Sequence, residues 1–442
     1  MKKLVKNIIS MTIIMSLTLG LMACGSSNKE NKETESNQSG DTVSDTQDSK
    51  QSVTGSLSIL TDATGSEFTA LSQVNDRFME EYPNIKVEFV SLGADYENTM
   101  KVKMASNKLP DVFSTHGWAK LRYNDYLMDL KDEAWAKDID PAIWSLVTDG
   151  DKVLALPMDS YRTGFVYNVS ILEEYGIEVP ETLDELEAAF AVIKEKSGGT
   201  VSGLHIGGGD NWMYGAIINT LSTPLTSTDV AGAGPALLDG TYDWNEYKIL
   251  PEKLLEYYNK GYLNKDCLTA TFADTTKALA ENKAAFVAMG PELITGALEV
   301  NPDFVGAIMP IPAIHDGDTP SFQGGEKNSW GIWKDTKEAD LAKLYLEFSA
   351  QPENIELICQ ATSSPSGLVT VEPDLGDLGK YWTLYENNPV YPMWDRTYMP
   401  NGMWDVMSVA GQDLIGGSLD ADGFVNQMKS EYLRLREVAE NE

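Results

Sequence analysis

The stretch SLSILTDATGSEFTALSQVNDRFMEEYPNIKVEFV, residues 56–90, contains two different hydrophobic periods. Residues 85–90 alternate apolar with charged side chains, which is typical of a half-buried strand. The run SLSIL at the start of the stretch predicts another short strand. Between the two runs, apolar residues recur at the spacing of a helix face: Phe68, Leu71, Val74, Phe78 and Tyr82. The stretch therefore predicts a strand, a helix and a strand in succession.

The sequence that follows continues this alternation. A second helix is predicted near residues 95–106, and a third short strand within LPDVFST, residues 109–115. Strands that alternate with helices form a mostly parallel sheet with helices on both faces. Farther along, Thr182 and Glu185 form a capping box that predicts the start of another helix, and Gly198 is placed to end it. The predicted fold class is α/β, and 442 residues are enough for two compact lobes.

The N-terminus is typical of a targeting segment. Three lysines within the first six residues precede an apolar run at residues 8–23, which is shorter than the roughly 20 residues of a spanning helix. The sequence LMAC, residues 21–24, resembles the lipobox of bacterial lipoproteins. This resemblance implies a signal peptide at residues 1–23, acylation of Cys24, and a protein anchored by lipid on the extracytoplasmic face of the cell membrane.

Residues 24–55 are predicted to form a disordered tether. After Cys24, Val43 and Val53 are the only large apolar residues of this segment. Such a composition cannot bury enough apolar surface to offset the conformational entropy that folding removes.

The charge of the chain excludes several classes of partner. There are 34 basic and 67 acidic residues, and the net charge is −33. Such a chain would repel the phosphates of nucleic acids, and we expect no nucleic-acid partner. For the same reason we expect contact with the membrane only through the lipid anchor.

Motifs for catalysis and metal binding are missing from the sequence. It contains no G-x-S-x-G, H-E-x-x-H, C-x-x-C or Walker-type motif, and its three histidines are scattered. LDADGF, residues 419–424, resembles half a calcium loop, but Lys429 stands where a bidentate Glu is required, so helix capping is the better interpretation. We therefore expect that the protein has no cofactor, binds no metal and is not an enzyme. Cys267 and Cys359 could pair or stay free.

Aromatic side chains stand beside polar ones in several segments that are typical of loops. Sugars present apolar C–H faces that stack on aromatic rings, and hydroxyls that hydrogen-bond to carboxylates, amides and guanidinium groups. As a group these segments favour a sugar site: STHGW (114–118), DSYRTG (159–164), GGGDNWMYG (207–215), YPMWDRTY (391–398) and NGMWD (401–405).

The order of the segments resembles the extracellular solute-binding proteins of carbohydrate ABC importers, the family that includes the maltose-binding protein. YNVSILEEYGIEVPETLDEL (167–186) and ENKAAFVAMGPE (281–292) carry most of this resemblance. It implies a two-lobed periplasmic-binding-protein-like fold of type II. Each lobe would be a mixed, mostly parallel sheet flanked by helices, and the ligand would lie in a cleft between hinge-connected lobes.

The same resemblance implies where the chain changes lobes. Lobe one would contain residues 56–162 and 291–350, and lobe two residues 163–290 and 351–442. The hinges would then lie near residues 160–164, 289–291 and 350–352.

The resemblance also implies which residues bind the ligand. The candidates are Asp62, Glu67, His116, Trp118, Tyr161, Arg162, Trp212, Gly325, Glu326, Trp394, Asp395 and Trp404. Other interpretations compete with this one. Asp62 and Glu67 could be solvated carboxylates, Arg162 could form a structural ion pair, and Trp394 and Trp404 could pack in a helix core. The chain also departs from the family, because Glu292 stands where relatives often carry Trp.

These observations together predict a substrate-binding lipoprotein of an ABC importer. The protein would be a monomer that captures a mono- or oligosaccharide and delivers it to the transmembrane subunits of a permease. One alternative is a surface enzyme that degrades glycans, and another is the same fold with a peptide or polyamine as ligand.

Overall fold

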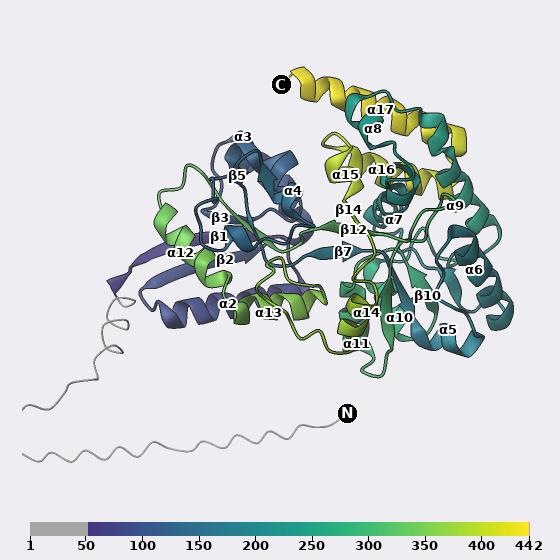
Figure 1. Ribbon diagram of the computed structural model, residues 1–442, viewed down its shortest axis with the longest axis horizontal. Coiled ribbons are helices and arrows are strands. Elements are labelled where there is room, and N and C mark those ends of the chain that lie inside the picture. Colours follow the sequence, from purple (N-terminus) through teal and green to yellow (C-terminus); the bar gives the residue numbers. More distant parts are fainter. Residues whose placement is uncertain (1–51, 442) are drawn as a thin grey trace, which may run out of the picture. The chain divides into compact units, whose positions relative to one another are not determined.

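The computed structural model describes residues 52–441 (Figure 1). The predicted signal peptide, Cys24 and most of the predicted tether lie outside the described residues. Among the described residues, no helix combines the length and hydrophobicity that a membrane span requires.

The first sheet contains the strands that the opening stretch predicts. β1 pairs in parallel with both β2 and β3, as the alternation of strands and helices predicts, whereas β13 runs antiparallel to β3 and β6. The strand order is β2 (Ile85–Ser91), β1 (Gly55–Thr61), β3 (Val112–Ser114), β13 (Ser329–Ile332) and β6 (Leu156–Pro157).

Both faces of this sheet are covered. On one face, Leu57 and Ile59 of β1 belong to a buried cluster, here called the first core, against which α2 (Gly65–Glu81), α12 (Ala339–Ser349) and α13 (Pro352–Thr362) pack. On the other face, Phe113 of β3 packs with Tyr96 and Met100 of α3 (Tyr96–Ala105). The two faces alternate along the strands because successive side chains of a strand point in opposite directions.

A second sheet has its own core. β8 (Phe165–Asn168) is central and antiparallel to both neighbours, β11 (Gly306–Met309) and β10 (Ala284–Val287), and β10 is parallel to β9 (Ser202–Leu204). The buried cluster around this sheet, here called the second core, includes residues of most of the remaining helices. These are α5 (Val169–Tyr175), α6 (Leu183–Ser197), α7 (Trp212–Ser222), α8 (Gly234–Asp239), α9 (Ile249–Asn259), α10 (Phe272–Ala280), α11 (Glu292–Val300), α15 (Trp394–Thr397), α16 (Met403–Ile415) and α17 (Ala421–Asn441).

A small third sheet carries the chain between the two cores. β7 (Tyr161–Thr163) leads from the first core to the second, and β12 (Phe322–Gly325) leads back. The two strands are antiparallel, and β14 (Val390–Pro392) pairs in parallel with β12. Figure 1 shows these three strands between the other two sheets.

The packing differs from the predicted lobe boundaries. Leu293 and Ile294 of α11 lie in the second core, although residues 291–350 were expected in lobe one. Ile355 and Ile358 of α13 lie in the first core, although residues 351–442 were expected in lobe two. The chain therefore crosses along β7 and β12 and again between Leu368 and Leu378, and not near residues 289–291 or 350–352. An amphipathic helix shows in its sequence that one face is buried, but not which sheet covers that face.

Several local predictions are confirmed. Thr182 and Glu185 form the capping box of α6, and Gly198 ends this helix in the left-handed conformation. Asp420 accepts a hydrogen bond of 2.8 Å from the backbone N–H of Gly423 at the start of α17, which is the capping interpretation of LDADGF. The two cysteines are free and buried in different cores, Cys267 in the second and Cys359 in the first.

Phe78 of α2 provides a test of the first core. It is fully buried, and its ring centroid lies 5.2 Å from that of Tyr345 and 5.3 Å from that of Phe348. Phe78→Ala leaves a cavity and should lower the free energy of unfolding by about 3–5 kcal/mol, measured by urea denaturation. Val102→Ala on the exposed side of α3 is the control and should change it by less than about 0.5 kcal/mol. An equal effect of the two substitutions would contradict this assignment of the core.

Candidate functional site

Polar and aromatic side chains follow β1 and β3, where these strands end. Asp62 comes directly after β1, and His116 and Trp118 come shortly after β3. Because β1 and β3 pair in parallel, their carboxyl ends lie at the same edge of the sheet, which is where ligands commonly bind in α/β proteins. Ser114 donates a hydrogen bond of 2.8 Å from Oγ to Asp62, and Nδ1 of His116 lies 3.9 Å from the Asp62 carboxylate.

Glu97, in the first turn of α3, connects His116 to Arg122. Its Oε1 lies 2.5 Å from Nε2 of His116, and its Oε2 is paired with the Arg122 guanidinium. Burial raises the pKa of Glu97, but the hydrogen bond and charge of His116 and the charge of Arg122 outweigh burial and hold this pKa below its ordinary value. Arg122 also donates to Oδ1 of Asn401 at 3.3 Å, in the loop before α16 of the second core.

Two guanidinium groups lie over the ring of Trp118. Cζ of Arg122 lies 4.0 Å from the ring centroid and Cζ of Arg396 lies 5.2 Å from it. A Cβ at Gly117 would lie 1.5 Å from Nη1 of Arg396, so glycine leaves the room that this guanidinium occupies. Gly117 has a φ of +89° and His116 a φ of +31°, which is uncommon for a residue other than glycine. The loop after β3 is therefore shaped around the side chain of Arg396.

Glu326 and Asp395 follow β12 and β14, which end at the same edge of the third sheet because they are parallel. The two residues are 0% and 2% exposed, and their carboxylate oxygens have no hydrogen-bond partner among the described residues. Nε of Arg396 lies 3.9 Å from Oδ2 of Asp395 and also lacks such a partner. Burial raises the pKa of Glu326 to about 7 and raises that of Asp395, and the charge of Arg396 offsets only part of this effect. Buried polar groups normally have partners, so these carboxylate oxygens are exceptions that require an explanation.

A buried hydrogen-bond network positions Asp395. Its backbone N–H donates to Oδ1 of Asn219 at 2.9 Å, and Nδ2 of Asn219 donates to Oε1 of Gln323 at 2.7 Å. Gln323 in turn donates from Nε2 to Oγ1 of Thr223 at 2.8 Å. This network joins β12 to α7 and holds Asp395 on rigid elements, while the carboxylate of Asp395 keeps its oxygens free of partners.

A second polar cluster contains Glu67, Tyr161, Glu292 and Lys327. Nζ of Lys327 lies 2.5 Å from Oε1 of Glu67 and 3.9 Å from Oε1 of Glu292. The hydroxyl of Tyr161 donates to the Glu292 carboxylate at 2.8 Å. Burial raises the pKa of Glu67 to about 7 although the charge of Lys327 lowers it. The predicted residues Glu67 and Tyr161 therefore lie together, joined by two residues that were not predicted.

The remaining predicted residues have different surroundings. Trp394 is fully buried in the second core and stacks on Tyr247 at 5.7 Å between ring centroids, so the competing core interpretation applies to it. Trp212 packs on Phe272 at the edge of the second core. Arg162 lies 5.9 Å from the ring centroid of Trp382, away from the site residues, because its neighbour on β7 is Tyr161 and adjacent strand residues point to opposite faces.

Two predicted residues lie where the groups of side chains meet. Trp404 is partly buried and packs both against the second core and against the cluster that contains Trp118. Gly325 is the last residue of β12, and a Cβ there would lie 3.0 Å from the Met393 side chain. Its lack of a side chain lets the segment before α15 pack closely on β12.

Several residues of these clusters were not predicted from the sequence. Arg396 lies within the segment YPMWDRTY, and Lys327 follows Glu326 directly, so both had a neighbour that was predicted. Arg122 lies four residues after Trp118, one helical turn away. No comparable signal marks Glu97, because acids are frequent throughout the chain.

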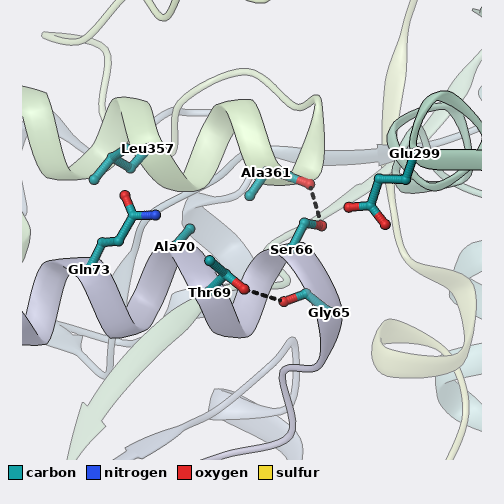
Figure 2. Close-up of a pocket in the computed structure, with 8 residues that line it drawn as sticks. All are labelled: Gly65, Ser66, Thr69, Ala70, Gln73, Glu299, Leu357 and Ala361. Carbon is teal, nitrogen blue, oxygen red and sulfur yellow. Dashed lines mark hydrogen bonds between the residues drawn. The ribbon is translucent and has the colours of Figure 1, made fainter. Parts of the chain in front are cut away.

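A surface groove lies beside the start of α2. α2 and α13 lie side by side, and Glu299 of α11 lies beside the end where Ser66 and Ala361 meet (Figure 2). None of the predicted ligand-binding residues is among the eight that line it: Gly65, Ser66, Thr69, Ala70, Gln73, Glu299, Leu357 and Ala361.

Comparisons with known proteins agree with this architecture. The sequence profile of bacterial extracellular solute-binding proteins matches residues 62–356. The melibiose/raffinose/stachyose-binding protein MelE of Bacillus subtilis is 37% identical over 382 residues, which are 86% of this chain and 89% of that protein. A sugar transporter protein of Bacillus licheniformis, solved in complex with stachyose, is 39% identical with a TM-score of 0.80, over 86% of this chain and all of that one.

A binding protein of Bacillus subtilis solved in an open conformation is 37% identical with a TM-score of 0.80, over 88% of this chain and 99% of that one. The profile covers more than half of the chain, and the sequence identity extends over most of the described residues. The chain belongs to the bacterial extracellular solute-binding protein family.

Proposed function

We propose that this protein captures a neutral oligosaccharide of the group formed by melibiose, raffinose and stachyose and delivers it to an ABC permease. A lipid on Cys24 would hold it, as a monomer, at the outer face of the membrane. The named relatives that bind these sugars support the choice of ligand. The bound sugar would lie among the residues around Trp118, Glu326 and Asp395.

The observation that carries this proposal is the pair of unpartnered carboxylates. Glu326 and Asp395 are buried, and their carboxylate oxygens accept no hydrogen bond from the described residues, although Nε of Arg396 lies 3.9 Å from Oδ2 of Asp395. An unsatisfied buried polar group costs about 1–3 kcal/mol, and more when it is charged. Sugar hydroxyls are donors that can satisfy such oxygens without adding charge, and they can also accept from Nε of Arg122 and Arg396, which lack partners as well.

Aromatic surface beside these carboxylates supports the same conclusion. Trp404 is partly exposed and packs against the cluster that contains Trp118, so its ring can contribute an apolar face to a sugar. The ring of Trp118 is covered by Arg122 at 4.0 Å. A sugar that stacks on Trp118 would therefore have to displace this guanidinium.

The cations of the site reduce its attraction for a polyamine. Arg122 pairs with Glu97, Lys327 pairs with Glu67, and Arg396 lies beside Asp395, so part of the negative charge is already neutralised. A neutral polyol needs no such attraction.

Calorimetric titration with a panel of ligands tests the proposal. We expect binding heats with melibiose, raffinose and stachyose, which share a terminal galactosyl unit, and weaker or no heats with maltose, spermidine and a short peptide. Binding of spermidine or the peptide without any sugar would contradict the proposal. Release of monosaccharide from stachyose by a catalytic amount of the protein would instead identify a glycan-degrading enzyme.

Asp395→Asn tests the role of the unpartnered carboxylate. A hydrogen bond to a charged group contributes about 1.5–3 kcal/mol, so the dissociation constant of the cognate sugar should rise by about 10- to 100-fold. The melting temperature should change by only a few degrees, because removing a buried charge without a hydrogen-bond partner offsets the loss of its attraction to Arg396. Asp405→Asn, at an exposed position of α16, is the matched control and should leave both values unchanged. An unchanged affinity of Asp395→Asn would remove Asp395 from the site.

The pKa of Glu326 gives a second test. In the free protein this pKa is raised to about 7, and hydroxyls that donate to the carboxylate would lower it on binding. The ionised form then binds the sugar more tightly, so affinity should increase from pH 5.5 to about pH 8 and binding should release a proton. Calorimetry in two buffers of different ionisation enthalpy measures this release. Glu326→Gln should abolish the part of the proton release that comes from this carboxyl group and flatten the pH dependence of the affinity. An unaltered pH dependence would contradict the assignment.

A further inference from the structure

We propose that Lys327, together with Tyr161, holds Glu292 and so forms a latch between the two cores that favours their contact before any ligand binds. The effect of this latch on sugar affinity rests on the proposed function. The latch itself can be tested without a sugar.

The members of the latch come from different parts of the fold. Glu67 belongs to α2, which packs in the first core, and Glu292 is the first residue of α11, which packs in the second. Tyr161 begins the crossing strand β7, and Lys327 lies two residues after the crossing strand β12. The cluster thus contains one carboxylate from each core and a donor from each crossing.

The backbone of Lys327 is fixed on the side of the first core. Its N–H donates to Oδ1 of the buried Asp159 at 2.8 Å, and Asn328 donates to the same carboxylate from its backbone and side chain. The side chain of Lys327 is then paired with Glu67 at 2.5 Å. These contacts position the ammonium group, which still reaches Glu292 of the second core at 3.9 Å.

Glu292 is held at both of its carboxylate oxygens. The Tyr161 hydroxyl lies 2.8 Å from each oxygen, and the Glu292 side chain is 11% exposed. Gly290 makes this approach possible, since a Cβ there would lie 1.9 Å from the Tyr161 hydroxyl oxygen. If the Lys327 ammonium and the Tyr161 hydroxyl moved away, the Glu292 carboxylate would be left buried without partners. That state has a large free-energy cost.

Separation of the two cores would break the contacts of Glu292 with Lys327 and Tyr161. The cores also meet where Arg122 donates to Asn401 and where Arg396 lies on Gly117, and these two contacts involve residues proposed to hold the sugar. A third contact, 2.6 Å between the hydroxyls of Thr295 of α11 and Ser363 after α13, does not. Separating the cores moves α11 relative to α2, and the bonds from Lys327 and Tyr161 to Glu292 connect the two sides. The latch therefore shifts the population towards the arrangement in which the ligand residues converge, and the apparent affinity follows this population.

The test compares Glu292→Gln with Glu299→Gln. Both remove one negative charge from α11 without a large change in size, but Glu299 lines the exposed groove of Figure 2 and lies two turns from the latch. The protein is dialysed free of ligand, and its radius of gyration is measured by small-angle X-ray scattering with and without stachyose. Lys327→Met removes the cation from the other side of the pair, and circular dichroism checks that each variant is folded.

We expect Glu292→Gln and Lys327→Met to have a larger ligand-free radius of gyration than the wild type, and Glu299→Gln to have the wild-type value. With saturating stachyose all four proteins should have the same radius, and the two latch variants should bind about 3- to 10-fold more weakly, as for a binding-competent state of reduced population.

An unchanged ligand-free radius in Glu292→Gln would overturn the latch, even if sugar affinity falls, because that result would make Glu292 a direct ligand contact. Glutamine has nearly the same shape as glutamate, so Glu292→Gln alone tests the latch if Lys327→Met does not fold. If no sugar binds the wild type, the proposed function fails, but the ligand-free radii still test the latch.

Discussion

The pairing of β7 with β12 is the constraint on which the rest of the site depends. In the register of these strands Gly325 is opposite Tyr161 and Gly324 opposite Arg162. Because side chains alternate between the faces of a strand, a shift by one residue would exchange the directions of Tyr161 and Arg162. The same pairing joins two passages of the chain between the cores, so the residues that follow β12 meet those that begin β7. The parallel partner β14 then brings Asp395 to the edge where Glu326 lies.

The polar groups around this constraint fall into two kinds with opposite consequences. The side-chain amides of Gln323 and Asn219 are buried, and their groups are hydrogen-bonded to each other, to Thr223 and to the backbone of Asn219 and Asp395. Such a satisfied network makes the position of Asp395 rigid. The carboxylates of Glu326 and Asp395 are equally buried, but they lack partners and therefore destabilise the protein when no ligand is present. A fold that keeps both kinds side by side has a rigid frame and an unsatisfied interior, which is the arrangement a selective polar binding site requires.

Local structure could be predicted from the sequence, whereas long-range packing could not. The capping box of Thr182 and Glu185 and the parallel order of β1, β2 and β3 follow from short-range hydrogen bonding and from hydrophobic period, and both are present. The sheet that each of α11 and α13 covers depends on contacts distant in sequence, and there the predicted boundaries differ from the packing. Among the candidate residues, His116 and Glu326 lie in the clusters after the strands, as their positions in the sequence predict. The surroundings of Arg162 and Trp394 depend on the direction of the side chain, which is known only once the strand register and the helix packing are known.

The latch and the unpartnered carboxylates act in opposite directions on the empty protein. The bonds from Lys327 and Tyr161 to Glu292 favour contact between the cores whether or not a sugar is present. Burial of Glu326 and Asp395 without hydrogen-bond donors disfavours the same arrangement, and in the proposed site sugar hydroxyls would remove this cost. A ligand can shift a conformational equilibrium only through its different affinity for the two states. If the sugar binds as proposed, this difference would reside in those carboxylates, and the latch would set how far the equilibrium must move. In this proposal selectivity and affinity are thus assigned to separate groups of residues next to the same crossing strands.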